Sequence, residues 1–369
     1  MRVAIIGSGP AGVATAVALR NREEGRHLEV TLYHRNERQR WPVGETLPPA
    51  AWGALSQLGL AYLLDSSVHT PCPGSLSVWG SHTPVANDFM LEADGTGFHL
   101  DRRRFERDLL AAARRLDVDV QPARTLRRIT DLRHGFELGF QTDAGPEQTV
   151  ADFVVDASGQ SASFARRLPI ARNRVDEVIS LYARLPVPEN ASIPDYTLLE
   201  ATPHGWWYLS RIPDNHCILS LTTDKEAFAE QGFGQLDRWC HAYEQARWLN
   251  TRMTLAEEGM LRDATVQRAT ASSAILSNCV GERWLAVGDA ACSYDSITSA
   301  GITKSLMQGR QAGNAIADCM AGDPQSLQRY QASVFDQFNR YIGLRHYLYH
   351  RETRFPGAGF WQRRQAISA

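Results

Sequence analysis

The sequence predicts an α/β protein with a parallel sheet, a second, mixed β-sheet and a C-terminal helical segment. Three observations support this fold class. The chain begins with a β-branched strand, a glycine-rich turn and a helix, in "RVAIIGSGPAGVATAVALR". Two later apolar strands end in aspartate, at Asp156 and at Asp289. An aromatic strand, "GWWYLSRIP" at 205–213, lies between them in the chain.

Length and composition limit the classes of protein to consider. A chain of 369 residues is longer than one hydrophobic core usually supports. We therefore expect two packed regions of roughly 100–200 residues each. The net charge of -2 gives no general attraction to nucleic acid or to anionic lipid. No apolar run reaches the ~18 residues that a membrane span needs. The six cysteines form no Cys-x-x-Cys pair and no metal-ligand spacing, so we expect reduced thiols in a cytoplasmic protein without a bound metal.

The first glycines follow the pattern Gly-x-Gly-x-x-Gly, between a strand and a helix. The first glycine permits a tight turn, the second lets a diphosphate approach the backbone, and the third lets the helix pack on the strand. The helix start presents free N–H groups and the positive end of the helix dipole. We therefore expect a dinucleotide diphosphate to be bound by Gly7, Gly9, Pro10, Ala11 and Gly12.

The second strand, "LEVTLYH", ends without the acidic residue that usually binds a ribose about 20 residues past the glycines. His34, followed by Arg35, stands at that position. An imidazole can exchange one hydrogen bond with a ribose hydroxyl but cannot bind two as a carboxylate does. We place both residues among the cofactor-binding candidates.

Two further segments narrow the cofactor. They are "FVVDASGQSASFARRL" (153–168), with Asp156 and Gly159, and "ERWLAVGDAACSYDSITSAGITKSLMQG", with Gly288 and Asp289. Behind an N-terminal glycine loop, this pair resembles the flavoprotein hydroxylase superfamily. The resemblance implies FAD, bound by a Rossmann-like domain of the glutathione-reductase type. It also implies that Asp289 binds the ribitol chain and that the following loop carries the flavin ring.

The resemblance extends to two helix starts. Ala300, Gly301 and Ile302 begin a helix whose N–H groups are expected to face the flavin N1/C2 edge and to stabilise its reduced anion. "FHLDRRRFERDLLAAARRL" predicts an amphipathic helix, and relatives place an arginine near the FAD diphosphate just before it. Arg102 is the best match, with Arg103 and Arg104 as alternatives.

Other stretches point to one branch of the superfamily. These are "WPVGETLPPAAWGALSQLGL", with a Gly-Glu-x-x-x-Pro signature at Gly44, Glu45 and Pro49, the aromatic strand, and an aromatic and arginine-rich C-terminus. Together they resemble the branch that contains tryptophan halogenases and halogenase-like flavoproteins. The latter modify tryptophan in partner proteins and build the quinone cofactors of amine and amino-acid oxidases.

The halogenase chemistry itself is not predicted. Halogenases of this branch need a lysine in the N-terminal half, and this chain has none before Lys225. They also place a glutamate in the flavin loop where Thr298 stands here. We therefore expect a flavin enzyme that does not halogenate.

The remaining chemistry is oxygen transfer to an electron-rich ring in a dry pocket. We expect a single-component FAD-dependent monooxygenase that uses O2 to hydroxylate an aromatic, indole-like substrate, in particular a tryptophan of a partner protein. Without a second nucleotide motif, NADH or NADPH must bind transiently, or a separate flavin reductase must supply electrons. Candidate catalytic residues are Glu45 as proton acceptor, Trp206 and Tyr208 as pocket wall on one strand face, and Thr298 in the flavin loop.

Two other functions and one structural alternative stay open at this point. The chain also fits a flavin-dependent reductase of an isoprenoid or other alkene, or a non-catalytic flavoprotein chaperone. The C-terminal segment 340–364 suits either a protein-docking surface or a clamp between domains. The predicted division is a discontinuous FAD-binding domain (1–60, 98–165 and 265–322), a substrate domain (61–97 and 166–264) and the C-terminal segment 323–369.

Overall fold

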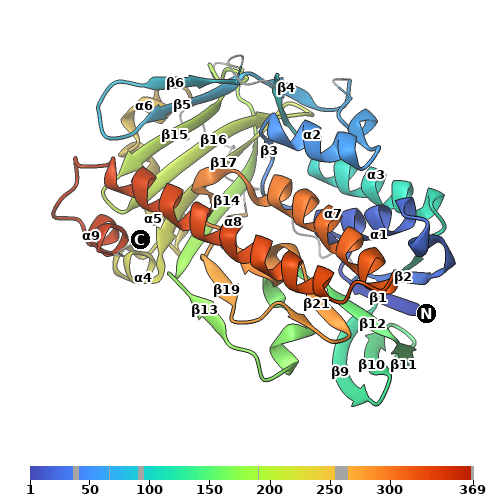
Figure 1. Cartoon of the computed structure of the whole chain (residues 1–369). Helices are drawn as coiled ribbons and strands as arrows, with labels where there is room; N and C mark the ends of the chain where they lie inside the picture. Colours follow the sequence, from blue (N-terminus) through green and yellow to red (C-terminus); the bar gives the residue numbers. More distant parts are fainter. Residues whose placement is uncertain (36–40, 66, 90–94, 190, 254–264, 367–369) are drawn as a thin grey trace.

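Two large sheets and a pair of long C-terminal helices organise the molecule (Figure 1). The computed structural model describes residues 1–369 apart from 36–40, 66, 90–94, 190, 254–264 and 367–369. In Figure 1 the mixed sheet lies at the upper left, the parallel sheet at the lower right, and helices α7 (Gly301–Met320) and α8 (Gln325–His350) cross in front.

The six-stranded sheet has the order β20-β21-β12-β1-β2-β8 and is parallel except for the β20–β21 pair. Its central strands are apolar and buried, as expected for strands covered on both faces. Helix α1 (Pro10–Asn21) packs against α7 and against α3 (Arg102–Arg115). The strands are β1 (Arg2–Ile6), β2 (Glu29–Tyr33), β8 (Asp119–Gln121), β12 (Phe153–Asp156), β20 (Val280–Gly281) and β21 (Trp284–Ala286).

The seven-stranded sheet has the order β18-β14-β17-β16-β15-β5-β6. One face packs on α4 (Lys225–Gln231), α5 (Leu236–Glu244) and α6 (Arg247–Asn250) around the buried rings of Trp207, Trp239 and Tyr243. The opposite face turns toward the parallel sheet. The strands are β5 (Gly74–Val78), β6 (Val85–Asp88), β14 (Val178–Pro186), β15 (Thr197–Thr202), β16 (Gly205–Ile212), β17 (His216–Asp224) and β18 (Gln267–Thr270).

One strand corrects the predicted division of the chain. Residues 265–322 were expected to lie wholly in the FAD-binding domain, but β18 pairs with β14 of the seven-stranded sheet.

Short sheets and one helix complete the fold: β3 (Thr46–Leu47), β4 (Thr70–Cys72) and β7 (Gly97–His99); β9 (Thr125–Leu132), β10 (Gly135–Thr142) and β11 (Gly145–Ala151); β13 (Arg172–Arg174), β19 (Ala274–Leu276) and β22 (Cys292–Ser293); and α2 (Ala50–Gln57).

The C-terminal segment joins the two sheets. The α8 side chain Tyr330 donates to the carbonyl of Ala286 on β21, at 2.8 Å. Helix α9 (Gly359–Gln365) docks on the other sheet, where the Trp361 indole donates to the carbonyl of Thr202 at 2.8 Å. Most of the aromatic rings of this segment are therefore buried, and the segment acts as a clamp rather than as an exposed docking surface.

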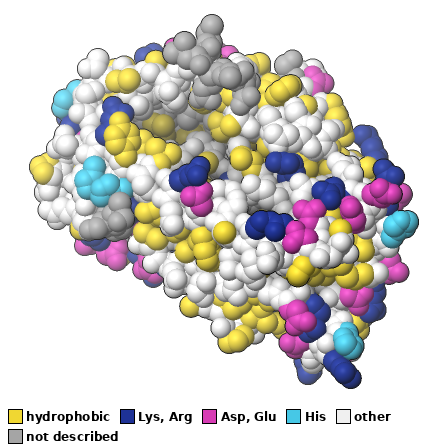
Figure 2. Space-filling view, viewed as in Figure 1, with side chains coloured by type: hydrophobic (Ala, Val, Ile, Leu, Met, Phe, Trp, Pro, Cys, Tyr) yellow, Lys and Arg dark blue, Asp and Glu magenta, His cyan; other side chains and the backbone are white. Residues whose placement is uncertain are grey.

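Among the described residues, none of the helices is both long and apolar enough to cross a bilayer. Figure 2 shows charged side chains of both signs interspersed over one face, in agreement with the net charge of -2.

Helices α1 and α7 cross at a glycine contact. A Cβ atom added at Gly309 would lie 2.6 Å from the carbonyl oxygen of Ala11 and from the Cβ of Ala14. A Cβ atom added at Gly343, on α8, would have no atom within 4 Å. Alanine in a helix is normally more stable than glycine by about 0.5–1 kcal/mol, whereas overpacking costs about 1–3 kcal/mol.

We therefore expect Gly309→Ala to lower the free energy of unfolding by about 1–3 kcal/mol and Gly343→Ala to raise it slightly. Urea denaturation of both variants measures the difference. Equal effects of the two substitutions would show that the α1–α7 contact has room to spare.

Candidate active site between the two sheets

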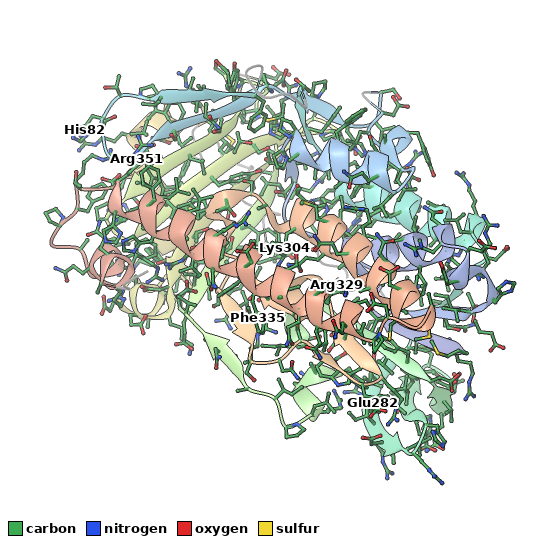
Figure 3. The ribbon with its side chains drawn as sticks, viewed as in Figure 1. His82, Glu282, Lys304, Arg329, Phe335 and Arg351 are labelled. Carbon is green, nitrogen blue, oxygen red and sulfur yellow. The ribbon has the colours of Figure 1, made fainter. Side chains whose placement is uncertain are left out.

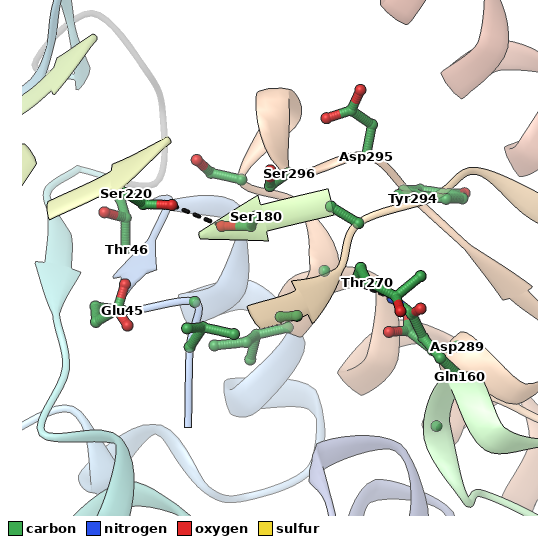
Figure 4. A pocket seen from close by; sticks show the side chains of 18 of the residues that line it. Glu45, Thr46, Gln160, Ser180, Ser220, Thr270, Asp289, Tyr294, Asp295 and Ser296 are labelled. Carbon is green, nitrogen blue, oxygen red and sulfur yellow. Dashed lines mark hydrogen bonds between the residues drawn. The ribbon is translucent and has the colours of Figure 1, made fainter. Parts of the chain in front are cut away.

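A cavity of about 330 Å³ lies between the parallel sheet and the seven-stranded sheet. Its lower wall is formed by the loops that follow β1, β12 and β21, at the carboxyl ends of parallel strands, where α/β proteins bind ligands. Its other wall is formed by β14, β16, β17 and β18. Figure 4 shows Glu45 and Thr46 on one side, and Gln160, Thr270 and Asp289 on the other.

The N-terminal glycine loop lines one end of this cavity. Gly7 has φ +121°, and a Cβ there would collide with the carbonyl of Ala157. A Cβ at Gly12 would collide with the carbonyl of Gly7, so both glycines serve close packing. Gly9 instead faces open space and lines the cavity with Pro10 and Ala11. Helix α1 has no side-chain cap, which leaves its first N–H groups available to an anion.

A second helix start faces the same cavity. Helix α7 begins at Gly301, with Ala300 as its cap residue, and it carries neither a side-chain cap nor an acidic residue in its first turn. Gly301 and Ile302 line the cavity. Two positive helix ends thus converge on one space, which favours a ligand with negative charge.

Glu45 is a buried carboxyl group on the opposite side of the cavity. It is 2% exposed, and its Oε1 is buried without a hydrogen-bond partner among the described residues. Burial raises the pKa of Glu45 to about 7, although the Arg102 guanidinium acts to lower it. A carboxyl group with this pKa exchanges protons near neutral pH, as a general acid or base must.

A chain of hydroxyl groups fixes the surroundings of Glu45. Tyr208 and Thr46 share a hydrogen bond of 2.8 Å, and Thr46 shares another with Thr197 at 2.9 Å. Thr197 lies 3.2 Å from the Nε2 of His99. Burial lowers the pKa of His99 to about 4, so this imidazole is neutral. Sequence reasoning missed Thr197 and His99, because neither belongs to a motif.

The sheet wall combines aromatic and small side chains. Trp206 and Tyr208 line the cavity, whereas Trp207 packs in the core on the other face, as strand alternation predicts. Ser180 and Ser220 form a hydrogen bond of 2.6 Å on the cavity floor (Figure 4). These small residues leave room for a flat ring beside the aromatic wall.

Comparison with known proteins identifies the family. Residues 79–369 match the family described as tryptophan halogenase. The chain belongs to the tryptophan halogenase family. The chain is also similar to the protein named as the FAD-dependent oxidoreductase LodB of Marinomonas mediterranea, which is 26% identical over 99% of this chain and 97% of its own.

Two solved structures share the fold. The peptidyl tryptophan dihydroxylase QhpG, described as essential for tryptophylquinone cofactor biogenesis, is 26% identical with a TM-score of 0.78, over 99% of this chain and 78% of its own. The flavin-dependent halogenase CmlS has a TM-score of 0.85 at 21% identity, over 100% of this chain and 68% of its own. The protein is therefore an FAD-dependent enzyme of the halogenase-like oxidoreductases.

The residues around the cavity fit FAD. Gly9 and the α1 N-terminus offer open space and free N–H groups for a diphosphate. Asp289 lines the cavity with its side chain 34% exposed, so its carboxylate would accept hydrogen bonds from the hydroxyl groups of a ligand bound there. Gly288, with φ +63°, turns the chain before it, and a Cβ there would lie 2.7 Å from the Cβ of Ala11.

Asp156 corrects one sequence prediction. Its carboxylate is fully buried and accepts hydrogen bonds from the Ser158 hydroxyl at 2.5 Å and from the Phe164 and Ala165 amides at 2.9 and 2.8 Å. It does not line the cavity and has no oxygen left for FAD. Its role is to hold the turn at Gly159, which does line the cavity.

The three candidate arginines have different surroundings in the structure. Arg102 is buried and lines the cavity, where it donates to the carbonyl of Gly44 at 2.7 Å. Arg103 stacks on Trp41, with its guanidinium 4.8 Å from the ring centre. Arg104 forms a surface ion pair with Asp108. Of the three arginines, Arg102 alone is among the residues that line the cavity, and its contact with the cofactor stays a prediction.

Eight predicted residues do not line this cavity: Gly7, Gly12, His34, Arg35, Asp156, Gly288, Thr298 and Ala300. His34 and Arg35 follow β2, and the ring of His34 lies 3.2 Å from the carbonyl oxygen of Arg35. Thr298 ends a short turn, Ser296–Thr298, and its hydroxyl is buried without a hydrogen-bond partner among the described residues. The contact of His34 and Arg35 with an adenosine stays a prediction.

The size of the cavity floor gives a test of where the substrate binds. A phenylalanine at Ser220 would fill part of the cavity along β17. We expect Ser220→Phe to reduce kcat/KM at least tenfold through lost space, with the bound FAD absorbance retained. Ser220→Ala, which keeps the space, is the control. Unchanged kcat/KM in Ser220→Phe would place the substrate elsewhere.

Proposed function

We propose that the protein is a single-component FAD-dependent monooxygenase that hydroxylates an aromatic, indole-like substrate. The substrate proposed is a tryptophan side chain of a partner protein, modified during formation of a tryptophan-derived quinone cofactor. The observation that carries this proposal is the set of charged groups at the cavity. It contains the buried carboxyl group of Glu45 and no lysine.

Neither lysine of the chain is placed to handle a hypohalous acid in the cavity. Lys225 and Lys304 are the only two lysines in the sequence. Lys225 is 64% exposed and pairs with Glu177 at 3.0 Å. Lys304 is enclosed and bonded to Asp289 at 2.6 Å. Neither lines the cavity, which supports hydroxylation over halogenation.

The relatives support the choice of substrate. QhpG is named as a peptidyl tryptophan dihydroxylase, and it covers 99% of this chain at the same 26% identity as LodB. An indole is flat and electron-rich, and it fits a cavity bounded by Trp206, Tyr208 and two serines. We extend the substrate class of QhpG to this chain on that basis.

The chain's own residues have defined tasks in this reaction. FAD, when bound, supplies the activation of O2. Glu45 accepts the proton that the ring loses when oxygen has been added, and Tyr208 holds the local hydrogen-bond network in place. The apolar and aromatic wall excludes water from the reacting ring. We propose NADH or NADPH, binding transiently, or a separate flavin reductase as the source of electrons.

Halogenation is the second candidate, because the family and the CmlS fold favour it. Co-expression with the precursor of an amine or amino-acid oxidase separates the two by mass spectrometry. Gain of one or two oxygen atoms on a tryptophan supports the proposal. Exchange of a hydrogen for chlorine or bromine supports halogenation, and the Glu45→Gln variant is the inactive control. An unmodified precursor overturns both candidates. In that case, reduction of an alkene by the enzyme supports the reductase function, and absence of flavin turnover supports the chaperone function.

A further inference from the structure

Lys304 is a buried ammonium group in the first turn of α7 (Figure 3). Its side chain is 3% exposed. A positive charge is unfavourable at this place for two reasons. Removal of an ammonium group from water costs free energy, and the N-terminal end of a helix carries a partial positive charge of its own. The contacts of Lys304 must therefore compensate for both effects.

The ammonium group contacts the segment from Asp289 to Tyr294, which includes strand β22 (Cys292–Ser293). Its Nζ donates to Asp289 Oδ1 at 2.6 Å and to the carbonyl of Cys292 at 2.5 Å. The third contact is with the ring of Tyr294, whose centre lies 4.4 Å away. Tyr294 is itself stacked on Tyr341 of α8, with 3.9 Å between ring centres. Lys304 is thus tied to the loop that lines the cavity.

The pair places a neutralised carboxylate at the cofactor cavity. Asp289 lines the cavity, and its Oδ1 is held by Lys304 while the side chain stays 34% exposed. Arg172 fixes the same loop by donating to the Asp289 carbonyl at 3.0 Å. With Lys304 in place, the carboxylate keeps a fixed orientation, and its negative charge is cancelled next to two positive helix ends.

We propose that Lys304 is a positioning residue for FAD, which would hold the Asp289 carboxylate in one orientation at the cavity and cancel its charge there. The inference depends on FAD binding, which the family establishes, and goes beyond the proposed substrate. If it fails, the proposed hydroxylation stands. If hydroxylation fails, the role of Lys304 stands.

The two parts of this role predict two measurements on the purified holoenzyme. Lys304→Met leaves Asp289 with an uncompensated charge and a free rotamer, so FAD affinity should fall roughly 10- to 100-fold, as expected for loss of a hydrogen bond to a charged group. Reduction of flavin adds negative charge, so the flavin midpoint potential should also become more negative. Lys304→Arg keeps the charge and should retain most of both properties.

Double substitution separates this role from simple packing. In the Asp289→Asn background, Lys304→Met should change FAD affinity less than about threefold, because the coupling is already lost. The potential of the double variant should return toward that of the wild type, since both charges are gone. Arg310→Met, which removes a positive charge further along α7, is the control for general charge effects.

Each outcome decides the proposal. Dependence of the Lys304→Met effects on Asp289 supports it. Equal losses of affinity in the two backgrounds, or an unchanged potential in Lys304→Met, overturn it. If Lys304→Met fails to fold, the double variant, which leaves no unpaired buried charge, still gives the decisive comparison with Asp289→Asn.

Discussion

Glu45→Gln is expected to slow substrate hydroxylation by roughly 10²- to 10⁴-fold, the usual contribution of a positioned general base. Glutamine keeps the shape of the side chain and cannot accept a proton, so FAD should remain bound. The measurement is kcat for oxygen transfer to the tryptophan-containing substrate, with the flavin spectrum as the check on folding. A loss in kcat with little change in KM is the expected pattern.

The pH profile should change in the same variant. Burial raises the pKa of Glu45 from its usual 4.5 to about 7. The base is active only when ionised, so kcat of the wild type should rise as the pH passes through about 7. Glu45→Gln should lack this rise. A wild-type profile that is flat between pH 6 and 8, at a rate limited by chemistry, would contradict the assignment.

Whereas kcat should rise with pH, the contribution of Glu45 to the free energy of unfolding should fall as the pH rises. Folding raises the pKa of Glu45, so the folded protein holds this proton more tightly than the unfolded chain. Its contribution is complete below pH 4.5 and is lost as the pH rises through about 7. The shift corresponds to roughly 3 kcal/mol at most. Glu45→Gln should remove that part of the pH dependence, which urea denaturation at several pH values measures.

A nearby carboxylate provides the control. Glu106 pairs with Arg102, as its i+4 neighbour on α3, and does not line the cavity. Glu106→Gln removes one negative charge near the same arginine without removing the proposed base. Its kcat should stay within a few-fold of the wild type. An equal loss in both variants would assign the effect to Arg102 rather than to proton transfer.

The parts of the site that the sequence predicts are those built by local backbone. Gly7, Gly9 and Gly12 lie within one turn and one helix start, so their roles follow from spacing alone. The same holds for Gly301, where α7 begins as predicted. Strand alternation correctly separates Trp206 from Trp207, because the two-residue period of a strand is fixed by its geometry.

The parts that were missed depend on contacts between distant segments. Asp156 and Asp289 look alike in the sequence, since both end a buried strand. What distinguishes them is their partner: Asp156 accepts from the amides of its own following turn, whereas Asp289 meets Lys304 from the next helix. Thr197 and His99 meet only because two sheets are packed side by side. No local pattern encodes such a contact.

Arg345 is the clearest example of such a long-range contact. It lies on α8 and is 1% exposed. Its guanidinium pairs with Asp176 at 2.8 Å and with Asp295 at 3.7 Å. Asp295 lines the cavity and accepts from the Tyr349 hydroxyl at 2.7 Å, and Tyr349 in turn accepts from the indole of Trp206 at 3.2 Å. One arginine thus connects α8, the cavity-lining segment at Asp295 and the aromatic wall.

Arg345→Met should therefore be severely destabilising. It leaves two buried carboxylates without a cation, and breaking a buried ion pair in this way costs about 3–5 kcal/mol. Burial already raises the pKa of Asp295, against the effect of Arg345. Because a raised carboxyl pKa means stability that is lost with rising pH, the variant should be weakest at alkaline pH. Urea denaturation as a function of pH measures both effects.

Two further variants distinguish a charge effect from a packing effect. Arg340→Met, on the same helix, removes a guanidinium that is 78% exposed and pairs with Asp336 at the surface, where such pairs contribute ~0–1 kcal/mol. Asp295→Asn in the Arg345→Met background removes one of the two uncompensated charges and should recover part of the stability. If Arg345→Met were no weaker than Arg340→Met, or if Asp295→Asn gave no recovery, the buried cluster would not be the link between α8 and the cavity. Recovery would identify the charge pair of Arg345 and Asp295 as that link, from which hydrogen bonds lead through Tyr349 to Trp206 in the cavity wall.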